Sequence, residues 1–287
     1  MSGRLGIITN NQHQVFQRNV IEGIRQEAHE RGYELVIASY AEDEAHPQPI
    51  TLDYRALDGV CVIANAAPPD LLRAILEANK PLSLVSHYVP DLPAPAVMVD
   101  NDQGIAELMR HLVVDCGRRR PVFIRGVPGQ WDSSKREAAF DREILRYNLT
   151  VPAELRVQGD FSVTTATESM KRLIAQKVPF DAVLATDYLM GIAAAETLRD
   201  AGYAVPGDVS VVGFGDAPEA KAAGLTTVAA NVVEQGQRAA RQLITQIIGL
   251  NIRGMTVLSV RPIVRKTSLP RSAARAARAG RSRARTD

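Results

Sequence analysis

The stretch DVSVVGFGDAPEA, residues 208–220, decides the fold class. Its apolar run is typical of a strand that is buried on both faces, as strands of a parallel sheet are. The run ends in Gly213-Phe214-Gly215-Asp216, where the chain turns polar. Because open parallel sheets bind ligands just outside the carboxyl ends of their strands, we expect this strand end to face a ligand.

Apolar runs of the same kind recur along the chain, and helical segments separate them. The first half has runs at 5–9, 34–39, 59–64, 82–86 and 96–100. After Arg118-Arg119-Arg120-Pro121 the pattern restarts, with runs at 121–126, 155–160, 182–186 and 209–214. Strands that alternate with helices imply right-handed crossovers and a parallel sheet. The sequence therefore predicts an α/β protein with two doubly wound, Rossmann-like parallel-sheet subdomains in series.

The end of the chain adds one more helix, 231–249, and one more strand, 256–264. We expect these segments to cross back and complete both subdomains, which would then be joined by a multi-strand hinge around a ligand cleft. The predicted subdomains are residues 4–119 with 231–252 and residues 120–230 with 253–267.

Composition fits this organisation, since 287 residues with 46% hydrophobic content can form two cores. Eight basic residues and one acidic residue fall within 265–287, which leaves 26 basic and 31 acidic residues before that segment. The main body is therefore mildly acidic and is not an evident nucleic-acid surface. Residues 268–287 are predicted to be a disordered basic tail, and an anion- or nucleic-acid-binding role for the tail is left open.

The sequence also indicates the compartment. Cys61 and Cys116 form no motif, which favours a reduced, intracellular protein. The first apolar run is too short for a signal peptide, and no segment has the length of a membrane span. We expect a cytoplasmic protein with no membrane partner.

Catalytic motifs are missing from the sequence. It contains no GxSxG, HExxH, CxxC or Walker A pattern, and its first loop, TNNQHQVF, lacks GxGxxG. All five histidines lie in the first half, so a hydrolase would need a second-half nucleophile that borrows one of them. We therefore expect no enzyme, no catalytic residue, no cofactor and no metal. An enzyme that uses His87, the histidine nearest a strand end, is the alternative.

The loop GVPGQWDSS, residues 126–134, is a candidate binding segment that includes the chain's one tryptophan. Ser134 begins a Ser-x-x-Glu capping box, which predicts Lys135 and Arg136 in the first helical turn. The helix dipole disfavours cations there, so the pair suggests a partner with negative charge or hydroxyl groups. Solvated surface residues are the alternative interpretation.

Other strand ends carry further candidates. Thr186 and Asp187 end one strand, Asp216 follows another, and Phe161 could stack on a flat or sugar-like ring. Thr186, Asp187 and Asp216 are also explained by capping of the following helices. These polar residues and the rings of Phe161 and Trp131 together provide planar polar groups beside an apolar face. That combination is what polyol recognition needs.

Several motifs carry a family resemblance: LDGVCVIA, VMVDNDQG, SSKREAAF, VQGDFS, VPGDVSVVGFGD and PIVRKT. With them the chain resembles, over residues 4–267, the effector-binding core of the LacI/GalR family. That core has the type I periplasmic binding protein fold. The resemblance implies a homodimer that binds a small, sugar-like effector between its subdomains and shifts between open and closed states. In the family an N-terminal helix-turn-helix reads operator DNA, and this sequence has no counterpart of it.

Most of the candidate residues come from positions carried over from the family. The full predicted ligand-binding set is Asn10, Phe16, Gln17, Gln130, Trp131, Asp132, Arg136, Phe161, Thr186, Asp187 and Asp216. The family often has a polar residue at the position of Gly215 and an asparagine at that of Thr186. Gln130 and Asp132 are the candidates to replace those contacts. We therefore predict an effector-sensing core, with a stand-alone solute-binding protein or a sensor module of a larger signalling chain as alternatives.

Overall fold

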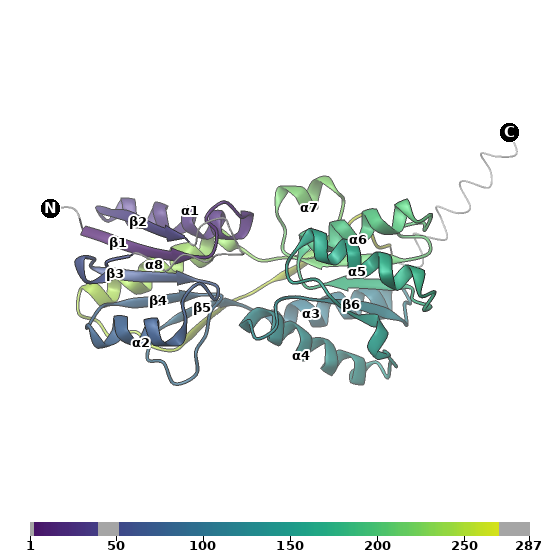
Figure 1. Cartoon of the computed structure of the whole chain (residues 1–287), viewed down its shortest axis with the longest axis horizontal. Helices are drawn as coiled ribbons and strands as arrows, with labels where there is room; N and C mark the ends of the chain where they lie inside the picture. The colour runs from purple at the N-terminus through teal and green to yellow at the C-terminus, as the bar shows by residue number, and fades with distance from the viewer. Residues whose placement is uncertain (1–2, 40–51, 270–287) are drawn as a thin grey trace, which may run out of the picture. The chain divides into compact units, whose positions relative to one another are not determined.

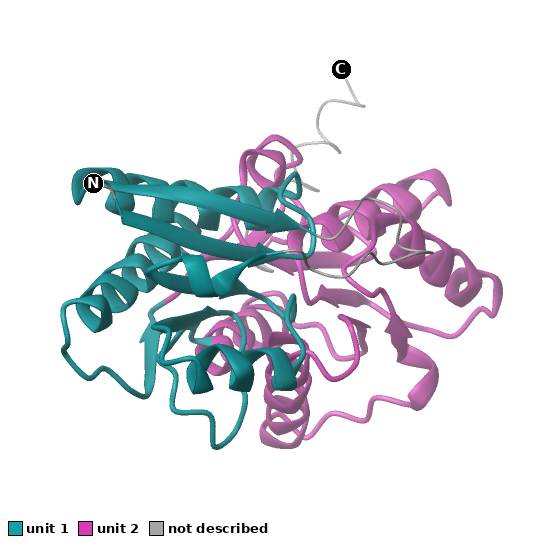
Figure 2. Ribbon diagram, turned by 60° about the vertical axis from the view of Figure 1, so that its left-hand side comes forward, with its two compact units in different colours: residues 1–100, 231–259 teal, residues 101–230, 260–287 magenta. Residues whose placement is uncertain are grey.

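The computed structural model describes residues 3–39 and 52–269, and they form two compact units. Unit 1 comprises residues 1–100 and 231–259, and unit 2 comprises residues 101–230 and 260–287 (Figure 2). The chain therefore passes from one unit to the other three times. Each unit contains one six-stranded sheet.

Unit 1 has a fully parallel sheet with the strand order β11-β5-β4-β3-β1-β2 (Figure 1). Its strands are β1 (Gly3–Thr9), β2 (Tyr33–Ser39), β3 (Gly59–Ile63), β4 (Leu82–Val85), β5 (Ala96–Val99) and β11 (Met255–Leu258). Its α-helices are α1 (Val15–Glu30), α2 (Pro69–Glu77) and α8 (Val232–Ile247).

Helices α1 and α8 touch backbone to backbone because both have glycine at the crossing. A Cβ atom on Gly23 would lie 2.0 Å from the Val233 carbonyl oxygen, and one on Gly236 would lie 2.0 Å from that of Val20. The close approach lets Leu243 of α8 join the strand residues of the same buried core. The chain thus returns to unit 1 over residues 231–259.

Unit 2 has the strand order β12-β10-β9-β8-β6-β7, and β12 is antiparallel to β10 while the other pairs are parallel. Its strands are β6 (Pro121–Arg125), β7 (Arg156–Gln158), β8 (Ala182–Ala185), β9 (Ser210–Phe214), β10 (Thr226–Ala229) and β12 (Arg261–Ile263). Its α-helices are α3 (Asn101–Arg110), α4 (Trp131–Arg146), α5 (Val163–Ala175), α6 (Tyr188–Asp200) and α7 (Pro218–Ala222).

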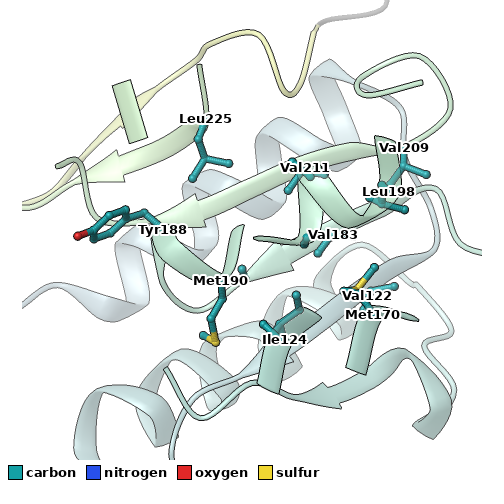
Figure 3. Close-up of a cluster of buried hydrophobic side chains, with 14 of the residues drawn as sticks. Val122, Ile124, Met170, Val183, Tyr188, Met190, Leu198, Val209, Val211 and Leu225 are labelled. Atoms are coloured by element: carbon teal, nitrogen blue, oxygen red, sulfur yellow. The ribbon is translucent and has the colours of Figure 1, made fainter. Parts of the chain in front are cut away.

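Alternation along β6 sends side chains to both faces of this sheet. Val122 and Ile124 pack with Met170 of α5 and Leu198 of α6 in one core (Figure 3). Phe123 points the other way and stacks on Phe140 of α4, with ring centres 4.3 Å apart. Both faces are therefore covered, as the apolar runs predicted.

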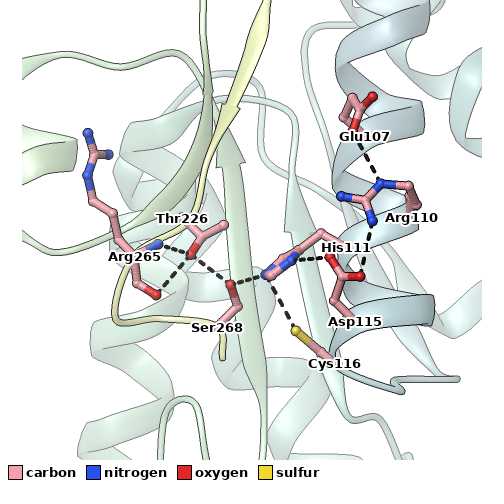
Figure 4. Close-up of polar contacts among 8 residues, drawn as sticks. All are labelled: Glu107, Arg110, His111, Asp115, Cys116, Thr226, Arg265 and Ser268. Atoms are coloured by element: carbon pink, nitrogen blue, oxygen red, sulfur yellow. Dashed lines mark hydrogen bonds and ion pairs between the residues drawn. The ribbon is translucent and has the colours of Figure 1, made fainter. Parts of the chain in front are cut away.

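The last described residues belong to the core of unit 2. Thr267 Oγ1 accepts a hydrogen bond from the Thr226 backbone nitrogen (2.9 Å), and Ser268 Oγ donates to Thr226 Oγ1 (2.7 Å). The ring of His111 joins Ser268 Oγ (2.8 Å) to the carboxylate of Asp115 (3.1 Å) (Figure 4). The prediction that the tail starts at residue 268 is therefore wrong for Ser268, which is fully buried. Residues 270–287 of the predicted tail lie outside the described residues.

The structure corrects two further predictions. The single strand expected over 256–264 is two strands, β11 and β12, which belong to different sheets. The division near residue 119 lies instead after Asp100, because α3 packs on α4 in unit 2. Strand β10 was not predicted, since its short sequence TTVA lacks a long apolar run.

We expect Gly236→Ala to lower the free energy of unfolding by about 1–3 kcal/mol, because the new methyl group forces α1 and α8 apart. Urea unfolding monitored by circular dichroism measures this effect. The control Arg238→Ala, at an exposed position on the same helix, should change stability by no more than about 0.5 kcal/mol. Equal stability of the Gly236 variant and the wild type would show that the helix contact is not tight.

Candidate functional site

Arg136 is the centre of a buried polar cluster in unit 2. Helix α4 begins at Trp131, with Gln130 as its N-cap, so the capping box predicted at Ser134 is wrong. Arg136 consequently lies in the second turn and not the first. Its residue exposure is 8%, which excludes the solvated-surface interpretation for this side chain.

Three segments of unit 2 hold the guanidinium. Nε donates a hydrogen bond to Asn101 Oδ1 (2.8 Å), and Nη1 donates to the carbonyl oxygen of Thr186 (2.6 Å). The guanidinium carbon lies 3.9 Å from the ring centre of Phe214. Phe214, the last residue of β9, therefore stabilises the arginine by a cation–π contact.

Asn101 bridges the arginine to a buried carboxylate. Its Nδ2 donates to Asp132 Oδ1 (2.8 Å), while Asp132 Oδ2 is 3.8 Å from Arg136 Nη2. Asn101 was not predicted as a site residue, although it stands inside the quoted motif VMVDNDQG. We call Asn101, Asp132, Arg136, Thr186 and Phe214 the Arg136 cluster.

Burial changes the electrostatics of this cluster. Desolvation lowers the pKa of the Arg136 guanidinium, whereas the nearby carboxylates of Asp132 and Asp187 raise it. Desolvation also raises the pKa of Asp187 to about 6, against the opposing effects of backbone hydrogen bonds and of Arg136. Carboxylates therefore outnumber cations around the buried guanidinium.

Thr186 and Asp187 both have structural roles. Thr186 is fully buried, and its hydroxyl donates to the Ile124 carbonyl oxygen (2.9 Å). Asp187 is the N-cap of α6 and accepts a hydrogen bond from the Met190 backbone nitrogen (2.7 Å). The capping alternative therefore holds for Asp187, and Thr186 contributes its carbonyl group to the cluster.

The loop that follows β9 begins with Gly215 and Asp216. Gly215 has a φ of +102°, a conformation that favours glycine. The carboxylate of Asp216 lies 2.7 Å from Arg265 Nη2, so it forms an ion pair within unit 2. This pair supports the loop-shaping interpretation of Asp216, and a contact with an effector stays a prediction.

Two predicted aromatic residues lie in the segments that follow β6 and β7. Phe161 also has a positive φ, 54°, and its ring covers Gly126, where a Cβ atom would lie 2.3 Å from the ring. The Trp131 ring lies 4.5 Å from Lys135 Nζ. Gln130, the N-cap of α4, has a buried Oε1 with no hydrogen-bond partner in the described part of the chain.

The predicted residues of unit 1 gather where β1 ends and α1 begins. Asn10 is exposed, and Phe16 is half-buried against the unit 1 core. Gln17 is 6% exposed, and its Oε1 has no hydrogen-bond partner among the described residues.

Two further residues of unit 1 share this property and were not predicted as ligand contacts. Thr9 Oγ1, at the end of β1, and His87 Nδ1, just after β4, are buried without a partner in the described ranges. Desolvation lowers the pKa of His87 to about 4, so its ring is neutral at pH 7. The only sequence signal was a polar residue directly after an apolar run.

Other features of residues 3–39 and 52–269 involve none of the predicted residues. A depression of about 330 Å³ lies on unit 2 beside Gln158 and Arg172, and it includes none of the predicted residues. No group of three or more His, Cys, Asp or Glu residues that could hold a metal is found in these ranges, and no helix there is both long and apolar enough to cross a membrane.

Residues 109–268 match the family model of the periplasmic binding protein-like domain. The chain belongs to this family. The match covers β6 through β12 and every residue of the Arg136 cluster except Asn101. The fold of this periplasmic binding protein-like domain is that of the effector-binding core of LacI-type regulators, as the sequence predicted.

Known regulators are similar to this periplasmic binding protein-like domain along most of its length. The HTH-type transcriptional regulator CelR of Thermobifida fusca is 28% identical over 253 residues, which are 85% of this chain and 74% of CelR. The probable repressor ExuR of Bacillus subtilis is 23% identical over 73% of this chain, which spans 62% of ExuR. Both relatives are transcriptional regulators by name.

Solved structures share the fold. A CelR–cellobiose complex superposes with a TM-score of 0.80 at 24% identity, over 93% of this chain and 85% of that chain. A putative LacI regulator from Bacillus cereus subsp. cytotoxis gives a TM-score of 0.83 at 22% identity, over 94% and 99%.

We expect Asn101→Ala to lower the free energy of unfolding by about 1–3 kcal/mol, since it leaves Arg136 Nε and Asp132 Oδ1 buried without partners. The matched control is Asp102→Ala, because Asp102 pairs with Arg142 at the surface. The control should cost less than about 1 kcal/mol. Urea denaturation of both variants measures the change in the free energy of unfolding. Equal losses in the two variants would contradict a special role for Asn101.

Asp187 should make the protein less stable as the pH rises. Its pKa is 3.8 ordinarily and about 6 in the folded protein, so between these values the folded state binds more protons than the unfolded state. Asp187→Asn keeps a good N-cap and removes the titration. We expect the wild type to lose about 1–3 kcal/mol more stability than the variant between pH 4 and pH 7. Unfolding experiments at each pH measure the stability of both proteins. If the wild type and the variant lose stability in parallel, the raised pKa of Asp187 is refuted.

Proposed function

We propose that this chain is the effector-sensing core of a LacI-type transcriptional regulator and that its effector is a small, sugar-like molecule. The observation that carries the proposal is the buried Arg136 at the carboxyl ends of β8 and β9. Its Nη2 has no hydrogen bond among the described residues, and the nearest carboxylate oxygen is 3.8 Å away. A buried guanidinium with a free donor is suited to an oxygen atom of a ligand.

The relatives support this proposal. CelR was solved with cellobiose bound, and it shares its fold with this chain. The aromatic rings of Trp131 and Phe161 can supply the apolar faces that a sugar ring needs. Asn10, Phe16 and Gln17 of unit 1 are proposed as further contacts with the same effector.

The effector is proposed to act by changing a conformational equilibrium. A ligand that binds one arrangement of the units better than another shifts the population toward it. We propose that a homodimer relays this shift to operator DNA through a helix-turn-helix domain, as the names of the HTH-type relatives suggest. No catalytic step is assigned to the chain.

Thermal denaturation with a panel of sugars, polyols and nucleobases tests the function. A ligand at a hundredfold excess over its Kd should stabilise the protein by about 2.7 kcal/mol. Arg136→Lys keeps the charge but loses the planar fork, so the shift should disappear. Arg142→Lys, at an exposed position on the same helix, should keep it. Equal shifts in both variants, or no shift with any sugar, would refute the proposal.

A further inference from the structure

The charges around Arg136 indicate what kind of effector the site accepts. Asp132 is 6% exposed and has no salt bridge shorter than 3.8 Å in the described structure. Asp187 adds a second carboxylate that interacts with the same guanidinium. Asp216 adds no net charge because Arg265 pairs with it, and Lys135 is exposed over the Trp131 ring. The buried groups therefore have a surplus of negative charge.

Two atoms of the Arg136 cluster make no hydrogen bond within the described residues and can therefore bind a ligand. Asn101 uses its oxygen for Arg136 and its nitrogen for Asp132. Asp132 Oδ2 remains as an acceptor, and Arg136 Nη2 remains as a donor. A ligand that satisfies both atoms must donate one hydrogen bond and accept another.

Unit 1 contributes an independent observation. Gln17 Oε1, Thr9 Oγ1 and His87 Nδ1 are buried without a hydrogen-bond partner among the described residues, and each belongs to a side chain that is more than nine-tenths buried. An unsatisfied buried polar atom costs about 1–3 kcal/mol, so each atom favours a ligand that supplies its partner.

The three atoms belong to one edge of the unit 1 sheet. Thr9 ends β1, Gln17 lies in the first turn of the helix that follows β1, and His87 follows β4. The pairings of β1 with β3 and of β3 with β4 put Ile8 level with Leu84, so Thr9 and His87 lie just beyond the same level of the sheet. None of the three side chains is charged at pH 7. An amide oxygen can only accept a hydrogen bond, so Gln17 requires a ligand that donates.

We infer that the effector is a hydroxyl-rich molecule without an anionic group and that Asp132 excludes sugar phosphates and sugar acids; this rests on the effector-sensing function proposed above. A hydroxyl group both donates and accepts, so a sugar can donate to Asp132 and accept from Arg136. Sugar phosphates and sugar acids also carry hydroxyl groups, but the Asp132 carboxylate repels the charge of their phosphate or carboxylate group.

Isothermal titration at pH 7 and constant ionic strength tests the inference with matched ligands. The neutral set is glucose, galactose, cellobiose and lactose, and the anionic set is glucose 6-phosphate, glucuronate and galacturonate. We expect binding within the neutral set and none within the anionic set. Asp132→Asn, which keeps an acceptor for Asn101, should weaken that sugar about tenfold. The same variant should narrow the preference for the neutral sugar over its anionic partner.

The matched control is Asp102→Asn, which removes the same charge from an exposed position on α3 and should leave every Kd unchanged. Gln17→Met provides a second variant; it should weaken the neutral sugar without altering the discrimination against anions. An anionic sugar that binds as tightly as the neutral sugars would overturn the inference and leave the sensing function standing. If no sugar of any charge binds, both the inference and the proposed function are overturned.

Discussion

The burial of one guanidinium organises the strand ends of unit 2. A cation taken out of water must be paired and hydrogen-bonded, and Arg136 meets this demand with Asn101, the Thr186 carbonyl and the Phe214 ring. Each partner comes from a different segment of unit 2. Arg136 can therefore be buried only when three segments are in place: the end of β8, the end of β9 and the start of α3.

The Arg136 cluster also includes a residue at a crossing of the chain between the units. Asn101 is the first residue of unit 2, and the preceding residue, Asp100, is hydrogen-bonded through its backbone nitrogen to Leu258 of unit 1 (2.9 Å). The hydrogen bonds of the proposed effector site thus begin one peptide bond from a crossing of the chain between the units.

The sequence contained much of the fold and less of the site. Long apolar runs such as VSVVGF indicate buried parallel strands, whereas TTVA is too short and too polar to be recognised. Its buried threonines find their partners in distant residues, as when Ser268 Oγ donates to Thr226 Oγ1. Arg136 could be identified from its motif. Its partner Asn101 could not, because 35 residues separate them and their bond exists only after folding. Backbone carbonyls such as that of Thr186 leave no trace in a sequence.

Neither unit is a continuous stretch of chain, and this has a consequence for biosynthesis. The core of unit 1 needs Leu243 from α8, and its sheet ends with β11, so the ribosome must translate the main part of unit 2 before unit 1 can be completed. Unit 2 in turn waits for β12 and for Thr267 and Ser268. Both units therefore become complete only as the last part of the described chain emerges, and a message truncated before α8 yields no finished unit.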